Sequence, residues 1–125
     1  NFSNEKLNFI EKNFSGDIYE IFNNIRALND QEKLISKLQS KCPMSLAVTT
    51  LLIENSLNRT LKECLEIEYR LSQKMVNRHD FGEGIEAVLI EKHHNPSWEP
   101  NSIENINKDD LEKLFSSTID NELKL

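Results

Sequence analysis

Apolar residues recur every three or four positions along most of this chain, the spacing that places side chains on one face of an α-helix. No stretch shows the alternation of apolar and polar residues that is typical of a half-buried strand. Residues that favour helix starts precede most of the periodic segments, and these are Ser3, Asp17, Asn29, Thr60 and Asn107. The pattern therefore predicts an all-α fold class with roughly six or seven helices.

The apolar positions also predict which side of each helix is buried. The segment from Met44 to Leu57 is rich in β-branched residues that also suit a strand. Its length and Pro43 at its start favour a helix, because proline fits the first helical turn. Outside this segment, the residues expected to face inward are Leu7, Ile10, Phe14, Ile18, Ile21, Phe22, Ile25, Leu28, Leu34, Ile35, Leu38, Leu111, Leu114 and Phe115.

The longest periodic segment runs from Leu61 to Val76, and it contains a carboxylate where apolar side chains are expected. A helical wheel places Glu68 in the middle of the apolar face. The other residues of that face are Leu61, Cys64, Leu65, Leu71, Ser72, Met75 and Val76. Since an unpaired buried carboxylate is costly, we expect Glu68 to join two segments as a structural group. An acid or base, or a half-exposed residue with no special task, are the alternatives.

A second helix follows a polar break and carries Gly82 and Gly84 near its start. No predicted strand precedes the two glycines and no third glycine follows, which excludes a dinucleotide-binding motif. Glycine allows another backbone to approach closely, so a packing role is the favoured interpretation. The alternative is an anion site, because free N–H groups at a helix start can bind a phosphate or a carboxylate.

The helical pattern stops after Lys92, where a cation is favourable at a helix C-terminus. An extended segment follows, in which Trp98 lies between Pro96 and Pro100. We expect Trp98 to dock this segment onto the helices as a clamp, with ligand stacking as the alternative. The polar tail, Ser116 to Leu125, is expected to fray.

These elements predict one helical domain over residues 1–125, a length that suits a single core. Its N-terminal helices occupy residues 1–42 and its central helices residues 43–92. An extended segment at 93–107 then leads to the last helix and tail at 108–125.

The composition of the chain argues against several classes of function. The net charge of −6 argues against a nucleic-acid surface, and no apolar run approaches the length of a membrane span. We interpret Cys42 and Cys64 as reduced core thiols, with a disulfide or a nucleophile as alternatives. His79, His93 and His94 lack the spacing of metal ligands, so we expect neither a metal nor a cofactor. The chain does not begin with methionine, so either a targeting segment was removed or this is a piece of a longer protein.

Several motifs together resemble one family. They are Glu68–Gln73, His79–Lys92 and Pro96–Pro100, supported by Cys42–Leu46 and Asp120–Leu125. In these motifs the chain resembles the C-terminal part of the 3-hydroxyisobutyryl-CoA hydrolases, a branch of the crotonase (enoyl-CoA hydratase/isomerase) superfamily. Each motif is weak alone, but the combination is specific.

The resemblance implies a crotonase-like fold whose ββα spiral core is absent from this chain. In the family that core holds the oxyanion-hole N–H groups and the acidic residues that act on the thioester. This chain would then be a helical cap with no catalytic residue of its own, which walls the acyl-CoA pocket or makes subunit contacts. The whole enzyme would bind acyl-CoA through the core and hydrolyse 3-hydroxyisobutyryl-CoA in valine breakdown.

The resemblance also assigns expected roles to single residues. Glu68 and the pair Glu83 and Gly84 match positions that the superfamily shares, and we expect structural roles for them. Ser72 stands where many hydratases have a phenylalanine that lines the CoA site, which favours the hydrolase branch. Lys92 is the nearest match, offset by one residue, to a lysine that reaches the CoA phosphates in some relatives.

Two other functions stay open. Relatives of this hydrolase serve as structural components of the mitochondrial ribosome, and an independent helical binding module would also fit the composition. A cap without its core should expose apolar surface and self-associate. The family implies a mitochondrial location. The final Leu123-Lys124-Leu125 differs in its first residue from the peroxisomal Ser-Lys-Leu signal, which makes a peroxisomal location the weaker alternative.

Overall fold

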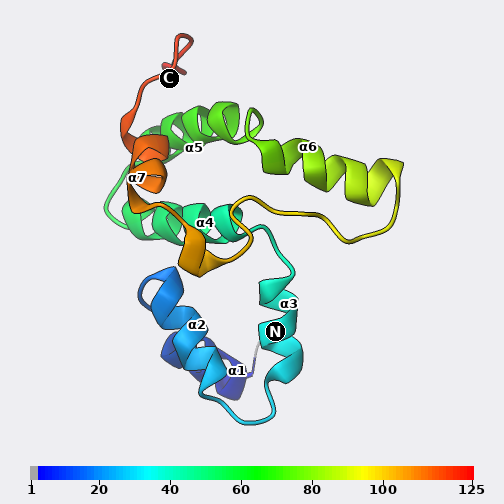
Figure 1. Cartoon of the computed structure of the whole chain (residues 1–125). Coiled ribbons are helices and arrows are strands. Elements are labelled where there is room, and N and C mark those ends of the chain that lie inside the picture. The colour runs from blue at the N-terminus through cyan, green and yellow to red at the C-terminus, as the bar shows by residue number, and fades with distance from the viewer. Residues whose placement is uncertain (1–2) are drawn as a thin grey trace. The chain divides into compact units, whose positions relative to one another are not determined.

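The computed structural model describes residues 3–125, and every regular element among them is a helix (Figure 1). The chain divides into two compact units, Asn1–Lys41 and Cys42–Leu125, each of which is described separately. The boundary lies one residue before the predicted end of the N-terminal helices at residue 42. The single domain over residues 1–125 stays a prediction.

The first unit contains α1 (Asn4–Asn13), α2 (Ile18–Arg26) and α3 (Glu32–Gln39). Two predicted caps are confirmed, since the Ser3 side chain accepts from the backbone of Lys6 and the Asp17 side chain from that of Glu20. The predicted cap at Asn29 is wrong. Asp30 has a left-handed backbone with φ of 63°, and α3 begins after it without a side-chain cap.

Burial in the first unit follows the predicted pattern only in part. Ile18, Ile21, Phe22 and Ile25 of α2 are buried as predicted. The predicted inward face of α1, which consists of Leu7, Ile10 and Phe14, is exposed. The prediction for α1 is wrong because periodicity identifies side chains that share a face, but not whether another element covers that face.

The second unit begins with α4 (Pro43–Ser56) and α5 (Leu61–Met75). Pro43 occupies the first turn of α4, and Thr60 and Glu63 form a complete capping box at the start of α5, both as predicted. A short 3₁₀ turn, η2 (Ile103–Asn105), precedes α7 (Lys108–Ser116). Asn107 caps α7 as predicted by accepting from the backbone of Asp109 and Asp110.

The core of the second unit lies where α7 contacts both α4 and α5, and where η2 contacts α4. The buried apolar residues of these elements and of the turn after η2 are Met44, Ala47, Val48, Leu71, Ile103, Ile106 and Leu114, while Ala87 is buried separately on η1. The ammonium of Lys74 on α5 caps the end of α7, with its nitrogen 2.7 Å from the carbonyl oxygen of Leu114 and in contact with Ser117.

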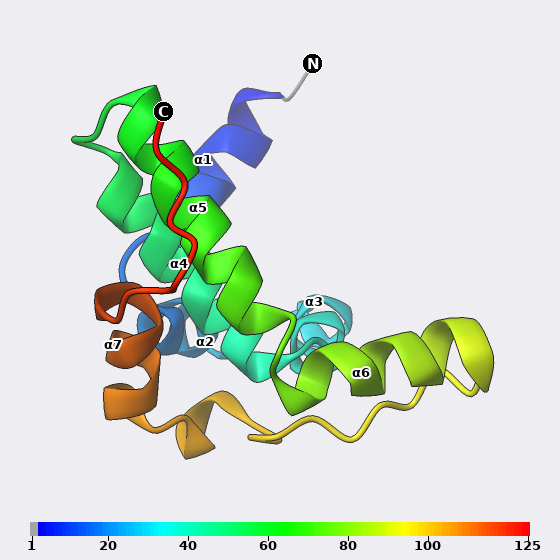
Figure 2. The same ribbon diagram turned by 90° about the horizontal axis from the view of Figure 1, so that it is seen from above.

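The C-terminal tail lies along α5 instead of fraying (Figure 2). Arg70 Nε of α5 pairs with Glu122 Oε1 at 2.7 Å, and the backbone N–H of Leu125 donates to Glu66 of α5 at 3.2 Å. The expectation of a frayed tail is wrong because polarity alone does not report cross-chain partners of this kind.

The remaining helix, α6 (His79–Ile85), continues directly into a π-helix, η1 (Glu86–Ile90). Lys92 ends this run with φ of 58°. Residues 93–100, called the strap below, then return beside α6, as Figures 1 and 2 both show. The backbone N–H of His94 donates to the carbonyl of Ala87 at 3.0 Å and so fixes the turn between η1 and the strap. None of the helices within residues 3–125 has the length and apolar character needed to cross a membrane.

Candidate functional site

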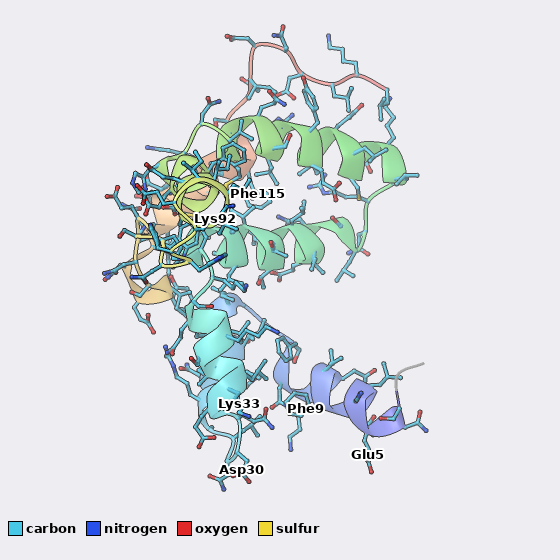
Figure 3. All side chains as sticks on the ribbon, turned by 90° about the vertical axis from the view of Figure 1, so that its right-hand side faces the viewer. Glu5, Phe9, Asp30, Lys33, Lys92 and Phe115 are labelled. Carbon is cyan, nitrogen blue, oxygen red and sulfur yellow. The ribbon has the colours of Figure 1, made fainter. Side chains whose placement is uncertain are left out.

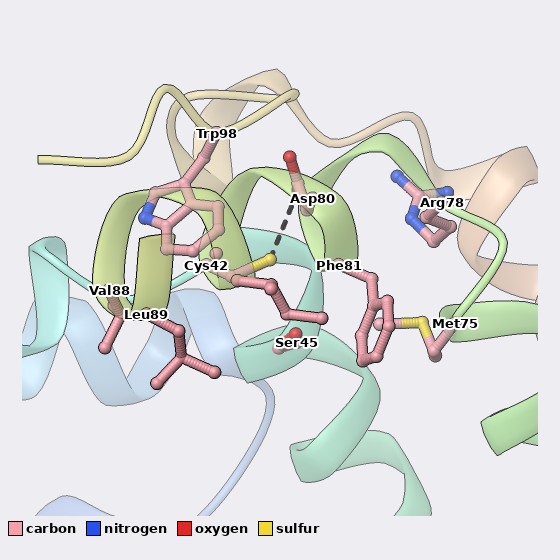
Figure 4. Close-up of a pocket in the computed structure, with 11 residues that line it drawn as sticks. Cys42, Ser45, Met75, Arg78, Asp80, Phe81, Val88, Leu89 and Trp98 are labelled. Atoms are coloured by element: carbon pink, nitrogen blue, oxygen red, sulfur yellow. Dashed lines mark hydrogen bonds between the residues drawn. The ribbon is translucent and has the colours of Figure 1, made fainter. Parts of the chain in front are cut away.

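An open groove of about 430 Å³ lies within the second unit (Figure 4). Its walls come from the start of α4, the end of α5, the run α6–η1, and the strap. Its lining residues are Cys42, Ser45, Met75, Arg78, Asp80, Phe81, Gly84, Ile85, Val88, Leu89 and Trp98. The volume falls in the range of small-molecule sites, and an apolar wall with a few converging polar groups is typical of such sites.

Asp80 is the polar centre of this groove. It is only 6% exposed, and a carboxylate buried to that degree needs hydrogen-bond donors. The thiol of Cys42 donates to its Oδ2 at 3.2 Å, as Figure 4 shows, and the backbone N–H of Glu99 donates to its Oδ1 at 2.7 Å. His79 Nδ1 lies 3.1 Å from the same Oδ1. One carboxylate of α6 therefore joins the start of α4, its own helix and the strap.

A second carboxylate of α6 holds the strap from the other side of Trp98. Glu83 Oε1 accepts from the backbone N–H of Ser97 at 2.7 Å. Arg78 Nη2 adds a long contact of 3.5 Å to the backbone carbonyl of Glu99, and the peptide bond between Glu99 and Pro100 is cis. The backbone on both sides of Trp98 is thus bonded to side chains of α6.

The two glycines of α6 have different surroundings. A Cβ added to Gly84 would lie 3.2 Å from Cη2 of Trp98, which is closer than ordinary packing allows. A Cβ added to Gly82 would have no such neighbour within 4 Å. Only Gly84 therefore has a local steric need for glycine, since the indole ring of Trp98 lies against its backbone.

The pKa values of two groups that contact Asp80 are both raised. The hydrogen bond to Asp80 raises the pKa of His79, and Glu99 and Glu83 add to this effect while partial burial opposes it. Burial raises the pKa of the Cys42 thiol, and Asp80 adds to it, while hydrogen bonds with Ser45 act in the opposite direction. Cys42 is therefore a thiol donor to Asp80 and a poor nucleophile.

Other sequence-predicted site residues lie elsewhere. Glu68 is exposed on α5, so its predicted burial is wrong, as it is for Leu61, Leu65 and Val76 on the same face. Leu71, at the edge of the predicted face, is buried as predicted, and Cys64 and Met75 are half-buried, so the helix packs through only one side of that face. The structural role of Glu68 stays a prediction.

Lys92 is exposed at the end of the run α6–η1, and Figure 3 shows its place there. The part of the chain that the structure describes contains no group of three His, Cys, Asp or Glu residues that could hold a metal ion. His93 instead pairs with Glu91, with Nε2 and Oε2 3.0 Å apart.

The sequence does not predict the tertiary roles of Asp80 and Arg78, and for Cys42 it favours a core thiol, with a disulfide or a nucleophile as alternatives. An acidic residue in the first turn of a helix is explained by the helix dipole, which hides any tertiary role of Asp80. Arg78 Nε is buried, and no described residue accepts its hydrogen bond. The signal that could have drawn attention to these residues is the charged run Arg78-His79-Asp80 at the start of a helix.

Comparison with known proteins extends this picture. The family model described as enoyl-CoA hydratase/isomerase matches residues 2–115. The mitochondrial 3-hydroxyisobutyryl-CoA hydrolase of Xenopus laevis is 36% identical over 124 residues, covering 97% of this chain and 32% of the relative. The enzymes of the same name from Danio rerio and Homo sapiens are 38% and 39% identical, covering 97% and 76% of this chain. The chain spans about a third or less of the length of these curated relatives.

Two solved structures also match this chain. A carnitinyl-CoA dehydratase from Mycobacterium thermoresistibile matches with a TM-score of 0.83 and 27% identity, covering 96% of this chain and 35% of its own. An enoyl-CoA hydratase from Rhodobacter sphaeroides matches with a TM-score of 0.80 and 25% identity, covering 88% of this chain and 34% of its own.

These structural matches correct the predicted fold class. The described residues are helical, but they match a third of larger enoyl-CoA hydratase-like chains, so an all-α class of their own is wrong. Helical periodicity reports local structure and cannot report the fold to which a set of helices belongs. The predicted resemblance, in contrast, is confirmed by the family model and the curated relatives. The chain belongs to the enoyl-CoA hydratase/isomerase family.

Proposed function

We propose that these 125 residues form the C-terminal part of an acyl-CoA thioester hydrolase, which converts 3-hydroxyisobutyryl-CoA to 3-hydroxyisobutyrate and CoA in valine breakdown. The observation that carries this proposal is the 36% identity to a 3-hydroxyisobutyryl-CoA hydrolase over 97% of the chain. The location that we propose is mitochondrial, since the curated relatives are named as mitochondrial proteins.

In this proposal the groove contributes to the wall of the acyl-CoA site, and the chemistry takes place on residues outside this chain. The apolar lining from Phe81 to Leu89, together with Trp98, suits the hydrocarbon parts of a thioester. The raised pKa of Cys42 and its bond to Asp80 argue against a nucleophile in the groove. We therefore assign binding, and no bond-breaking step, to the described residues.

Lys92 is the proposed contact for a CoA phosphate. It is an exposed cation at the end of the run α6–η1, which leaves its side chain accessible to an anion. In the longer enzyme Lys92→Ala should raise KM for acyl-CoA by about ten- to a hundredfold with little change in kcat, the size of one charge-assisted hydrogen bond. Lys124→Ala, at another exposed lysine, is the matched control. Equal KM values for the two variants would contradict the assignment.

The test of the whole proposal is the release of free CoA from 3-hydroxyisobutyryl-CoA. The assay compares the 125-residue chain with a protein in which the rest of the hydrolase length precedes it, and acetyl-CoA serves as the control thioester. We expect release by the longer protein only, with preference for the hydroxyacyl substrate.

Release of CoA by the 125-residue chain alone would contradict the proposal that the catalytic residues lie outside this chain. A silent longer protein would contradict the hydrolase and favour the two other functions, a structural component of the mitochondrial ribosome or an independent helical binding module.

A further inference from the structure

The strap has one aromatic side chain at its centre and a carboxylate contact on each side of it. Ser97 N–H is bonded to Glu83, and Glu99 N–H is bonded to Asp80. The ring between them lies against Gly84 and forms part of the groove wall. Asp80 is 6% exposed, and its hydrogen bonds connect the start of α4, α6 and the strap. Glu83 bonds the strap from a more accessible position.

We propose that Asp80 is a positioning residue that holds Trp98 in the groove wall, acting through the backbone N–H of Glu99. The Cys42 thiol fixes Oδ2 of Asp80, which leaves Oδ1 directed to the strap. Because the strap has no regular secondary structure from residue 93 to 98, few backbone bonds of its own oppose a displacement. Loss of Oδ1 therefore moves the indole ring and changes the shape of the groove.

His79 makes this positioning dependent on pH. The groups that face its ring are Asp80 and Glu83 from α6 and Glu99 from the strap, with ring nitrogens 3.1, 4.0 and 3.9 Å from their carboxylate oxygens. Protonated His79 offsets the repulsion among these three carboxylates. As the pH rises and His79 loses its proton, the repulsion is no longer offset and the strap is held less tightly.

Trp98 is the single tryptophan of the chain, so its fluorescence and its indole N–H resonance report the position of the ring directly. In the 125-residue chain, Asp80→Ala should make Trp98 more accessible to acrylamide and shift its emission to the red. Glu86→Ala, which removes an exposed carboxylate from the adjoining π-helix, is the matched control and should leave both signals unchanged. The same accessibility for both variants, in chains with unchanged helix content by circular dichroism, would overturn the proposal.

If the Asp80→Ala variant unfolds, the Asp80→Asn variant still allows the proposal to be tested. Its amide oxygen can still accept from Glu99 N–H, so it should restore the position of Trp98 while weakening the pH dependence. In the parent chain, acrylamide accessibility should rise with pH as His79 loses its proton, and His79→Gln should abolish that response. A response that persists in His79→Gln, or an Asp80→Asn variant that behaves like Asp80→Ala, would contradict the mechanism.

A last experiment rests on the proposed function, and in it KM for acyl-CoA is measured in the longer enzyme. If Asp80 acts through Trp98, Asp80→Ala should raise KM by about tenfold in the parent and have little effect in a Trp98→Ala background. Additive effects of the two substitutions would overturn the link between Asp80 and the groove. Absence of any hydrolase activity would count against the proposed function alone, because the fluorescence result does not depend on turnover.

Discussion

Two regions of the second unit are held together in different ways. Where α4, α5 and α7 meet, apolar side chains are buried, and Met44 and Leu71 are 1% and 4% exposed. Of the described residues in the run α6–η1 and its strap, Asp80 is buried and Ala87 is the one buried apolar residue, while Leu89 and Ile90 are 66% and 70% exposed. The first region depends on the hydrophobic effect, which is insensitive to direction and charge, and the second on directed bonds to carboxylates. The contrast teaches that packing defects should weaken the first region, and changes in charge the second.

The largest expected effect is on the free energy of unfolding, and it comes from the same Leu→Ala substitution made in each of the two regions. Leu71→Ala removes a buried side chain and should lower the free energy of unfolding by about 2–5 kcal/mol. Leu89→Ala, at an exposed leucine, should stay within about 0.5 kcal/mol of the parent. Chemical denaturation followed by circular dichroism measures both. Similar losses in the two variants would mean that Leu89 is covered in solution.

That coverage is itself a prediction, since exposed apolar side chains on η1 favour self-association of the isolated chain. Leu89→Ser combined with Ile90→Ser should weaken association by about tenfold or more, because it removes two apolar side chains from the contact. Sedimentation equilibrium at micromolar concentrations measures the dissociation constant. Lys37→Ser with Lys41→Ser, on exposed residues of the first unit, serves as the control. A parent chain that is monomeric throughout would contradict the prediction.

The two glycines of α6 sharpen the comparison within the second region. Gly82→Ala should stabilise the helix by up to about 1 kcal/mol, because alanine loses less backbone entropy and finds open space there. Gly84→Ala should forfeit that gain and displace Trp98, since its methyl group would lie 3.2 Å from the ring. Thermal unfolding and Trp98 emission distinguish the variants. A red shift in Gly82→Ala of the size seen in Gly84→Ala would refute the steric account.

The smallest expected effect concerns pH, and two groups should respond with opposite signs. His79 has a raised pKa, so its contribution to stability is complete below its ordinary value of 6.5 and is lost as pH rises through the value in the folded protein. The hydrogen bond from Arg70 lowers the pKa of Glu122, whose contribution is present above its ordinary value of 4.5 and is lost as pH falls. Unfolding midpoints between acidic and mildly alkaline pH, compared with His79→Gln and Glu122→Gln, measure both. A midpoint that rises with pH in the window controlled by His79 would contradict the sign.

The sequence predicts the elements well because their starts are encoded locally. The capping box of Thr60 and Glu63 and the proline at the start of α4 involve neighbours within one helical turn. Asp80 was missed because its partners lie 38 residues before it and 19 residues after it. No local pattern records such distances, and the first-turn position of Asp80 already had a sufficient local explanation.

The misplacement of Glu68 has a similar origin. The helical wheel correctly identifies a face of α5 that is mostly apolar, but the packing of α7 and the tail decides which face is covered. The family resemblance was accurate because it rested on several motifs at once, whereas the fold class was wrong because it rested on local periodicity alone.

Two of the cations of α5, Arg70 and Lys74, also restrict the rotation of that helix about its own axis. Arg70 and Lys74 are one helical turn apart, and they hold the tail and the end of α7 respectively. A helix fixed at two heights on one side cannot turn like a screw, even if its most apolar stripe would gain by turning inward. These two contacts favour the orientation in which Glu68, Leu61 and Leu65 face outward, so removal of the residues that follow α7 should allow α5 to rotate.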